Sequence, residues 1–420
     1  MPGSLHASPQ ATSTPSRRLL QAQYEFANGI VPGGATSVMT SVRLNCKPIK
    51  IVHVLHSFDM GGLENGVVNL INRLDWQRYD HVVCCITRSG RSAGRLRRDD
   101  VHIIELGKPQ GNDWYLPLRL ASLFRKLSPH IVHTRNWGTI DGIIGARIGR
   151  VPVVIHGEHG YSMAEVDGNN HKRTIVRWAL SPFVDRFVTV SKSLQDWLQN
   201  TVGIDEHKIT TICNGVDLAR FDNVCSKQAV RAAYGFRQDE FLIGTVGRLD
   251  PIKNQACLLR VLRDLVPQYP YARLLIVGHG PCYEQLREQT QQLGLADRVV
   301  LMGERDDIPQ LLQSLDVFVL PSLSEGIANT ILEAMAMGLP VIATRVGGNV
   351  ELVLDRETGF LIPSRNDFAL SEAMQVYLRE PSLAYQHGTA GRQRVVQRFS
   401  LSKMVETYDS LYSGLDHQNV

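Results

Sequence analysis

Short apolar runs alternate with longer amphipathic segments along the chain from residue 49 onward. In the first half, the apolar runs lie at residues 51–55, 81–87, 101–106, 130–134, 151–160 and 186–191. The segments at residues 63–74, 117–127 and 139–149 carry apolar residues at helical spacing. Strands that alternate with helices of this length predict a parallel, doubly wound α/β sheet.

A second series of the same kind follows a more polar stretch near residues 218–239. Its strands are predicted at residues 240–250, 272–280, 298–304, 316–322 and 339–345, with a helix at 254–268 among others. We therefore expect two Rossmann-like domains, at residues 49–217 and 218–398, and a helical segment at 399–420. The carboxyl ends of the two sheets would face a cleft, where such folds bind ligands.

The formal net charge of +4 resides at the N-terminus, because residues 1–50 contain five basic residues and a single acid, Glu25. The remainder is close to neutral, which argues against nucleic acid as a partner. Residues 1–48 are rich in Ser, Thr, Ala, Pro and Gly and lack the apolar segment of a secretory signal. We expect this tail to be disordered, and a translation start at Met39 is an alternative.

Cysteine usage and hydropathy both indicate a cytoplasmic location. The seven cysteines include no C-x-x-C pair, which fits neither a zinc site nor a disulfide framework. No run approaches the roughly 18–20 apolar residues that span a bilayer.

Two cations follow the strand predicted before residue 247, in the segment GRLDPIKN. Gly247 permits a tight turn, after which Arg248 and Lys253 lie at the carboxyl end of the strand. A planar guanidinium and a compact ammonium five residues apart suit a diphosphate, and Pro251 marks a helix start, which favours anions. The alternative is an ordinary solvated helix start.

The segment VGHGPCYEQL resembles a dinucleotide fingerprint only in part. It supplies Gly278 and Gly280, but Tyr283 occupies the position of the third glycine. A plain strand-to-helix turn is the favoured interpretation, which weakens an oxidoreductase hypothesis.

Two acids, Glu325 and Glu333, stand eight positions apart in SEGIANTILEAMAMGLPVIAT. We predict a helix over residues 329–337 with Asn329 as its N-cap, so that Glu325 lies in the preceding loop and Glu333 one turn inside. Ionised carboxylates repel a diphosphate but accept hydrogen bonds from paired hydroxyls. A ligand that suits both the cations and the acids is a diphosphate flanked by hydroxyl-rich groups, as in a nucleotide sugar.

The order and spacing of these motifs resemble glycosyltransferase family 4, retaining enzymes with the GT-B fold, over residues 49–413. The matching segments are GGLE at 61–64, HGEHG at 156–160, VTVSKSLQDWL at 188–198, NGVD at 214–217, GRLDPIKN at 247–254 and the segment with the two glutamates. HSFDMGGLENGVVNLIN and HTRNW resemble, more narrowly, the sugar transferases of the bacterial exosortase and PEP-CTERM exopolysaccharide systems.

The resemblance implies a role for each motif on the donor side. Arg248 and Lys253 would bind the donor diphosphate, Glu333 the ribose hydroxyls and Glu325 the transferred sugar. The same donor site would include Gly326, Ile327 and Asn329.

Other implied roles lie toward the acceptor. The Gly61-Gly62 turn would approach the phosphate or the reacting centre from the other domain, and the final helix would cross back onto the N-terminal domain. His159 matches the family's histidine beside the sugar and would be catalytic together with Glu325. This chain has Arg135 where many members have a second histidine.

The expected activity is transfer of a sugar from a nucleotide diphosphate sugar to a glycan or polyprenyl-linked acceptor, with retention of configuration. The sequence contains no Asp-x-Asp, so we expect transfer without a metal ion and with no cofactor beyond the donor. A nucleotide-sugar epimerase of the same architecture and a non-catalytic nucleotide-sugar-binding protein are the alternatives. The donor base, the sugar and the acceptor are not identified by these motifs.

An arginine-rich segment, RSGRSAGRLRR at residues 88–98, bears on the acceptor. A solvated loop is its plain interpretation. Alternatively, the segment rests on anionic lipid at the inner face of the cell membrane, where it would present a polyprenyl-linked acceptor.

Overall fold

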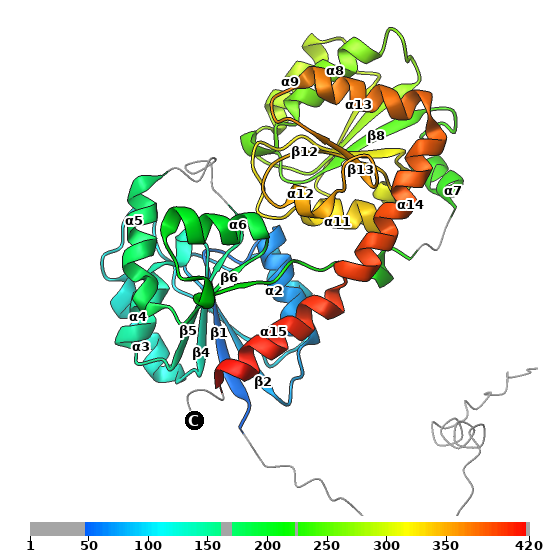
Figure 1. Cartoon of the computed structure of the whole chain (residues 1–420). Coiled ribbons are helices and arrows are strands. Elements are labelled where there is room, and N and C mark those ends of the chain that lie inside the picture. The colour runs from blue at the N-terminus through cyan, green and yellow to red at the C-terminus, as the bar shows by residue number, and fades with distance from the viewer. Residues whose placement is uncertain (1–46, 161–169, 223–225, 417–420) are drawn as a thin grey trace, which may run out of the picture. The chain divides into compact units, whose positions relative to one another are not determined.

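The computed structural model describes residues 47–160, 170–222 and 226–416. The tail expected at residues 1–48 lies outside this part of the chain, apart from its last two residues. From Lys47 onward the chain belongs to one compact unit, which contains two parallel sheets (Figure 1).

The first sheet has seven parallel strands in the order β3-β2-β1-β4-β5-β6-β7. These strands are β1 (Ile49–Leu55), β2 (Tyr79–Cys85), β3 (His102–Glu105), β4 (Ile131–Arg135), β5 (Val153–Glu158), β6 (Arg186–Thr189) and β7 (Ile209–Thr211). The α-helices between them are α2 (Gly62–Arg73), α3 (Leu116–Leu127), α4 (Asp141–Ile148), α5 (His171–Leu180) and α6 (Lys192–Trp197). Short helical turns are η1 (Arg91–Arg95), η2 (Trp137–Thr139), η4 (Ser181–Phe183), η5 (Leu198–Val202), η6 (Glu206–Lys208) and η7 (Leu218–Arg220).

The second sheet has six parallel strands in the order β10-β9-β8-β11-β12-β13. They are β8 (Phe241–Val246), β9 (Ala272–Val277), β10 (Val299–Gly303), β11 (Val317–Leu320), β12 (Val341–Thr344) and β13 (Gly359–Ile362). The helices are α7 (Lys227–Ala233), η8 (Pro251–Lys253), α8 (Ala256–Leu265), α9 (Tyr283–Gln292), α10 (Ile308–Ser314), α11 (Asn329–Ala336), α12 (Asn349–Leu352), α13 (Asp367–Arg379), α14 (Pro381–Arg398) and α15 (Leu401–Asp416).

Strand β1 shows why the apolar runs become central strands. Its side chains alternate between the two faces of the sheet: Ile51 packs in the cluster that contains α15, whereas Val52 and Val54 pack with Leu120 and Phe124 of α3. A strand covered by helices on both faces must be apolar at successive positions. The expected doubly wound α/β architecture is therefore confirmed.

The strand order places a topological switch point in each sheet, between β1 and β4 in the first and between β8 and β11 in the second. Neighbouring strands at these points lead into loops that diverge, and the crevice between the loops is where such folds bind ligands. The loop after β1 carries the Gly61-Gly62 turn, and the loop after β8 carries Arg248. Gly61, Gly62 and Arg248, which were predicted to be site residues, thus lie in loops at the switch points of the two sheets.

Strands β7 and β13 and helix α5 are among the elements that the sequence analysis did not predict. Strand β7 is three residues long with two half-buried threonines, and β13 is four residues long and follows a charged turn. They form strands because they pair with β6 and β12. Pairing with a distant strand produces no distinctive pattern in the local sequence. Helix α5 exposes Ile175, Val176 and Trp178, so its apolar positions do not mark a buried stripe.

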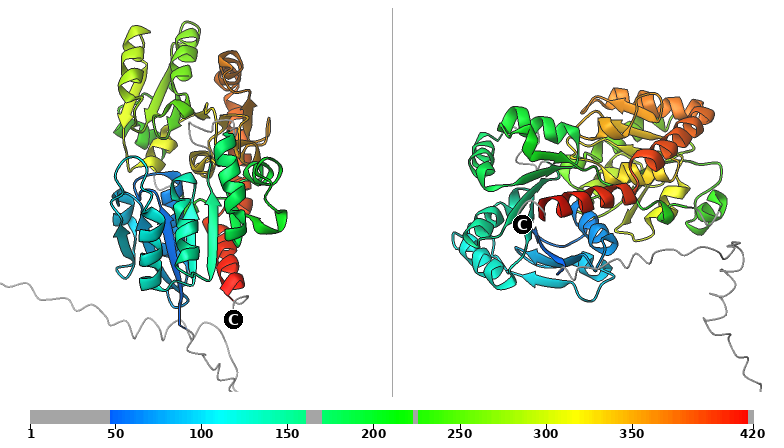
Figure 2. Two further views of the ribbon diagram at one scale, coloured as in Figure 1. Left: turned by 90° about the vertical axis from the view of Figure 1, so that its left-hand side faces the viewer. Right: turned by 60° about the horizontal axis from the view of Figure 1, so that its bottom comes forward.

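Helix α15 packs on the first sheet although it follows the second sheet in sequence. Met404, Tyr408 and Tyr412 are buried there among residues of β1, β4 and β5. The hydroxyl of Tyr79 donates to Oδ1 of Asp409 at 2.6 Å. Figures 1 and 2 show α15, in red, beside α2, in blue.

No helix within residues 47–160, 170–222 and 226–416 is long and apolar enough to span a bilayer.

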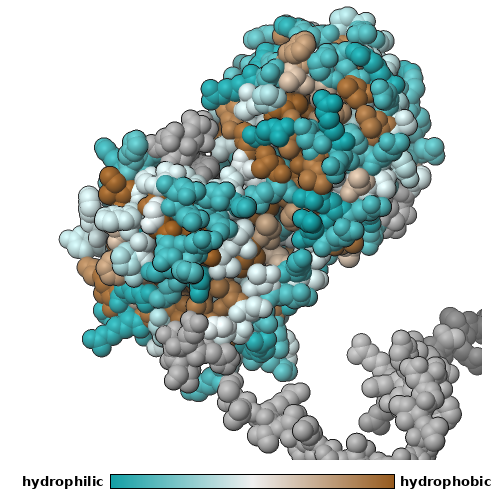
Figure 3. Space-filling view, in the orientation of Figure 1, coloured by the Kyte–Doolittle hydropathy of each residue, from teal (hydrophilic) through white to brown (hydrophobic). Residues whose placement is uncertain are grey.

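Some apolar side chains lie on the surface of the protein. Figure 3 shows one face that is largely hydrophilic, with small groups of apolar residues between. Trp114, Tyr115 and Trp178 are among the large apolar side chains that are exposed, and single exposed apolar residues are common on protein surfaces.

Two helical glycines provide a matched test of packing. A Cβ on Gly388 of α14 would lie 2.0 Å from the carbonyl oxygen of Gly338, whereas Gly414 of α15 has nothing within 4 Å. We expect Gly388→Ala to destabilise the protein by about 1–3 kcal/mol through overpacking. Gly414→Ala should stabilise it by roughly 0.5–1 kcal/mol through helix propensity. Thermal and urea unfolding midpoints measure both effects, and equal shifts in the two variants would contradict this packing.

Candidate functional site

Glu325 is buried beside a cation from the neighbouring strand end. Lys253 Nζ donates to Oε1 of Glu325 at 2.6 Å, and the hydroxyl of Ser322 donates to the same oxygen at 2.6 Å. The two loops are also joined by the backbone N–H of Leu323, which donates to the carbonyl oxygen of Ile252 at 2.7 Å. A carboxylate 7% exposed is stable only when paired in this way, and Oε2 remains an acceptor for a further donor.

Arg248 lies in the same loop as Lys253 but in a different environment. Its side chain is 72% exposed, and its closest acid is Asp250, at 3.7 Å. The side chain of Asp250 accepts from the N–H of Ile252 at 3.3 Å and so caps η8, the predicted helix start. One cation of the predicted pair is thus already engaged by Glu325, while the other faces solvent.

The glycines of VGHG have a structural explanation. A Cβ on Gly278 would lie 1.9 Å from the carbonyl oxygen of Gly247, and a Cβ on Gly280 would lie 2.4 Å from that of Leu249. Only glycine permits the loop after β9 to approach the loop of Arg248 this closely. These two glycines therefore support the cation loop.

The prediction of Asn329 as N-cap is wrong. Helix α11 is capped by Ala328, without a side-chain hydrogen bond, and Asn329 is its first residue. The side chain of Asn329 instead donates to the carbonyl oxygen of Gly62 at 3.1 Å and accepts from Asn214 at 2.8 Å. These contacts connect α11 to the Gly61-Gly62 turn, and they leave the first amides of α11 without a side-chain cap.

The loop after Glu325 is held by glycine contacts. A Cβ on Gly326 would lie 2.1 Å from the carbonyl oxygen of His159, and a Cβ on Gly347 would lie 1.7 Å from that of Glu325. Ile327, predicted in the donor site, is 8% exposed and packs in the apolar core. Its backbone is therefore the part that remains for a ligand.

His159 is half-buried at the carboxyl end of β5. Its backbone N–H donates to Oδ1 of Asn136 at 2.7 Å, and its Nε2 is buried without a hydrogen-bond partner among the described residues. Burial, and then the charge of Arg135, lower the pKa of His159 to about 3. The imidazole is therefore neutral at physiological pH.

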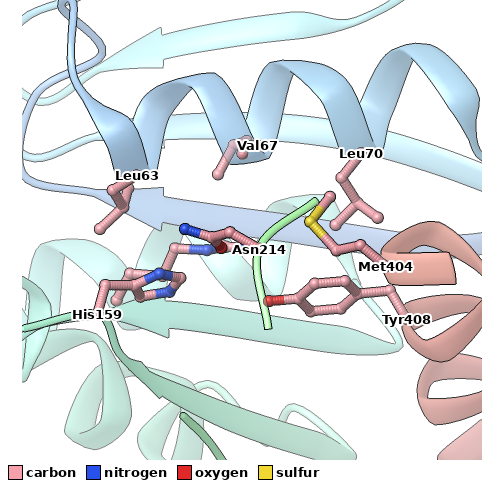
Figure 4. A pocket seen from close by; sticks show the side chains of 9 residues that line it. Leu63, Val67, Leu70, His159, Asn214, Met404 and Tyr408 are labelled. Atoms are coloured by element: carbon pink, nitrogen blue, oxygen red, sulfur yellow. The ribbon is translucent and has the colours of Figure 1, made fainter. Parts of the chain in front are cut away.

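The His159 ring lines a small pocket, which we call the β4 pocket. Figure 4 shows the labelled residues around it, contributed by α2, α15, the end of β5 and the loop of Asn214. The complete lining is Leu63, Gly66, Val67, Leu70, Arg135, His159, Asn214, Met404 and Tyr408. The sequence interpretation assigned no role to Arg135, and Tyr408 was missed because α15 is distant in sequence.

Glu333 lies in a second pocket, which we call the α11 pocket. It is lined by α2, η1, the segment 215–221 and α11, and contains Asn65, Arg95, Arg220 and Glu333. Burial raises the pKa of Glu333 to about 7, with partial opposition from the charges of Arg220 and Arg95. Neither arginine was predicted in the site, because Arg95 lies in the run interpreted as surface and Arg220 in a plain loop.

The arginines of the segment at residues 88–98 have different partners in the structure. Arg91 pairs with Glu304 at 2.7 Å, and Arg98 with Asp100 at 2.6 Å, while Arg95 points into the α11 pocket, where it donates to Asn65. Arg88 also pairs with Asp59, at 4.0 Å. Four of the five arginines are thus engaged within the protein, which weakens the argument for a continuous cationic surface.

Comparisons with known proteins agree with this architecture. Residues 60–220 match the family described as Glycosyltransferase Family 4, and residues 226–394 match Glycosyl transferases group 1. An Escherichia coli protein named UDP-Gal:alpha-D-GlcNAc-diphosphoundecaprenol alpha-1,3-galactosyltransferase is 31% identical over 303 residues, which are 70% of this chain and 78% of that protein. The capsular polysaccharide biosynthesis glycosyltransferase CapM of Staphylococcus aureus is 26% identical over 78% of this chain and 88% of its own.

A solved structure shows the same fold. The crystal structure of HepE from Anabaena in complex with UDP-glucose superposes with a TM-score of 0.77 at 22% identity, covering 87% of this chain and 99% of that one. The two doubly wound sheets are thus arranged as in GT-B proteins, as the motifs indicated. The chain belongs to glycosyltransferase family 4, and it is a glycosyltransferase with the GT-B fold.

Proposed function

We propose that the protein is a retaining glycosyltransferase that takes its sugar from a nucleotide diphosphate sugar. The observation that carries this proposal is the Lys253–Glu325 pair at the switch point of the second sheet, with the exposed Arg248 in the same loop. The E. coli relative is named for a UDP-galactose donor, and HepE was crystallised with UDP-glucose. A nucleotide diphosphate sugar agrees with the ligands in these two names and with the positive charges of Arg248 and Lys253.

The donor diphosphate would meet Arg248, Lys253 and the uncapped amides at the start of α11. Helix N-terminal amides favour anions, and preorganised donors around a leaving group stabilise its developing charge. We propose that this arrangement supplies the positive charge without a metal ion, and that no cofactor beyond the donor takes part.

The two glutamates would recognise hydroxyls on either side of the diphosphate. Oε1 of Glu325 is held by Lys253 and Ser322, so Oε2 would accept from the transferred sugar. Glu333, in the α11 pocket, would accept from the ribose. Its desolvation is a cost that paired ligand hydroxyls would offset.

The acceptor would enter beside His159. We propose a glycan or polyprenyl-linked acceptor in bacterial exopolysaccharide synthesis, consistent with the diphosphoundecaprenol substrate in the name of the E. coli relative and the capsular role in that of CapM. Transfer with retention would proceed on the front side of the sugar, where the neutral His159 contributes polarity without adding charge. The family assignment favours this activity over the epimerase and the non-catalytic alternative.

The Lys253–Glu325 pair gives a direct test of the donor site. A thermal-shift screen of nucleotide sugars identifies the donor, since a bound ligand stabilises the folded protein, and transfer is then assayed with lipid-linked and glycan acceptors. Glu325→Ala and Lys253→Ala should each lower turnover by about 10²-fold or more, with circular dichroism checking the fold. Glu372→Ala, at an exposed acid on α13, is the control with expected normal turnover. Near-normal rates in both site variants would refute the assignment.

The pKa of Glu333 predicts how stability depends on pH. The carboxyl titrates near 4.5 in the unfolded chain and near 7 in the folded protein, so the folded state binds more protons between these values. Its contribution therefore becomes increasingly destabilising as pH rises from about 4.5 to about 7. We expect Glu333→Gln to be more stable than the wild type at pH 8, by on the order of 2 kcal/mol.

Urea unfolding between pH 5 and pH 8 measures this difference. The advantage of Glu333→Gln should shrink as pH falls toward 4.5. Glu372→Gln should show no such trend, since that acid is exposed. A pH-independent difference between wild type and Glu333→Gln would show that Glu333 titrates normally.

Metal independence is tested by chelation. If Arg248, Lys253 and the α11 amides neutralise the leaving diphosphate, EDTA should change the rate of transfer by less than about twofold, whereas removal of a catalytic metal costs orders of magnitude. Loss of transfer in EDTA, restored by Mg²⁺ or Mn²⁺, is the result that would overturn the proposal.

A further inference from the structure

Arg135 is a buried cation that has no acidic partner in the part of the chain that the structure describes. Its side chain lies at the carboxyl end of β4 and the residue is 3% exposed. Nη2 donates to Nδ1 of His53 and to Nδ1 of His133, each at 3.2 Å, and Nη1 donates to the carbonyl oxygen of His133 at 3.3 Å. All of these partners are uncharged acceptors, and no carboxylate in the described chain lies within 4.0 Å of the guanidinium.

The nearby acids do not neutralise this charge. Glu158, at the end of the adjacent strand, is engaged by Arg177 at 2.6 Å and by His156 at 3.3 Å. Glu64, on the first turn of α2, interacts electrostatically with Arg135 but forms no ion pair with it, and burial raises the pKa of Glu64. The charge on Arg135 is therefore uncompensated within the described residues, a state that normally carries a large desolvation cost.

The histidines around Arg135 present hydrogen-bond donors as well. A guanidinium only donates, so Nδ1 of His53 and of His133 must accept, and in the neutral rings the hydrogen lies on Nε2. Nε2 of His53 is 3.0 Å from Nδ1 of His81, which accepts this hydrogen. Nε2 of His133 has no partner among the described residues.

Arg135 lines the β4 pocket together with residues of α2 and α15. Arg135, His159, Asn214 and Tyr408 supply its polar lining. The Tyr408 hydroxyl forms no hydrogen bond with the described residues, and Figure 4 shows it directed into the pocket with His159 and Asn214 nearby. Apolar side chains of Leu63 and Val67 close the opposite wall. The pocket thus combines a fixed positive charge, an apolar wall, and the Tyr408 hydroxyl and His159 Nε2, which have no hydrogen-bond partner among the described residues.

We propose that Arg135 binds an anionic group of the acceptor, a phosphate or a carboxylate, in the β4 pocket, with Tyr408 and Asn214 as additional donors. The identity of the ligand as the acceptor rests on the proposed function. The pocket belongs to the first sheet and α15, whereas the proposed donor diphosphate site lies on the second sheet. Its position next to His159, whose carbonyl oxygen contacts the Gly326 loop, places the anion beside the reacting sugar. An anionic acceptor would be selected over its neutral analogue.

Inorganic phosphate is the probe for this site. Lys253→Ala in the full chain is the background, because it weakens phosphate binding at the donor site. Thermal unfolding is followed from 0 to 50 mM phosphate at constant ionic strength, with NaCl replaced by phosphate. We expect the midpoint to rise by roughly 2–4 °C and to saturate.

Adding Arg135→Met should have two effects. The midpoint without phosphate should rise, because an uncompensated buried charge is replaced by an apolar side chain of similar length, and the phosphate-dependent rise should disappear. Arg177→Met is the matched control, because Arg177 is equally buried but paired with Glu158; this substitution should lower the midpoint. Tyr408→Phe should reduce the phosphate response while the protein stays folded.

Three results would overturn the proposal: no response to phosphate in the background variant, an unchanged response with Arg135→Met, or a lowered midpoint in Arg135→Met like that of Arg177→Met. The last result would indicate that Arg135 is a structural residue, for instance a partner of Glu64. In a separate experiment, UDP and the nucleotide sugars are tested for thermal stabilisation of the protein with Lys253 unchanged. If none of them stabilises the protein while the phosphate arm behaves as expected, the proposed donor function fails and the anion site remains.

Discussion

Loops at the carboxyl edge of the second sheet pack backbone against backbone, and this close packing positions the candidate site. At Gly278, Gly326 and Gly347, an added Cβ would lie within 2.1 Å of a neighbouring carbonyl oxygen. Each contact joins two loops that carry a site residue or flank one. Lys253 and Glu325 approach to 2.6 Å across two loops that the backbone hydrogen bond from Leu323 to Ile252 joins, and the loop of Glu325 contacts that of His159. A side chain in place of any of these glycines would push the loops apart. The residues that the proposed chemistry needs close to one another would then be separated.

The charges of the two sheets are compensated differently. At the second sheet, Lys253 pairs with Glu325 at 2.6 Å in the absence of any ligand. At the first sheet, Glu158 is paired with Arg177, but Arg135 has no carboxylate partner within residues 47–160, 170–222 and 226–416. Uncompensated buried charge reduces stability, and proteins retain such features mainly at functional sites. This difference fits the proposal that the donor binds beside the Lys253–Glu325 pair and that an anionic group of the acceptor binds beside Arg135.

Local sequence patterns predicted the elements well where burial imposes a period. The strands β1, β8 and β12 consist mostly of buried apolar residues, and α11 spans residues 329–336 against a predicted 329–337. Prediction failed where another part of the chain decides the conformation. Strands β7 and β13 depend on their neighbours for pairing, and Asn329 was assigned to a cap although the contact with Gly62, 267 positions away, engages its side chain.

The sequence by itself determined the two doubly wound sheets, the loop positions of Arg248 and Glu325, and the resemblance to family 4, because each depends on residues close together in the chain. Only the tertiary structure decided which charges meet. It joined Lys253 to Glu325, directed Arg95 and Arg220 toward Glu333, and gave Arg135 histidine partners but no carboxylate among the described residues. Compensation of a buried charge depends on distances between side chains from different strands and helices, and the spacing of residues along one strand or helix does not encode those distances.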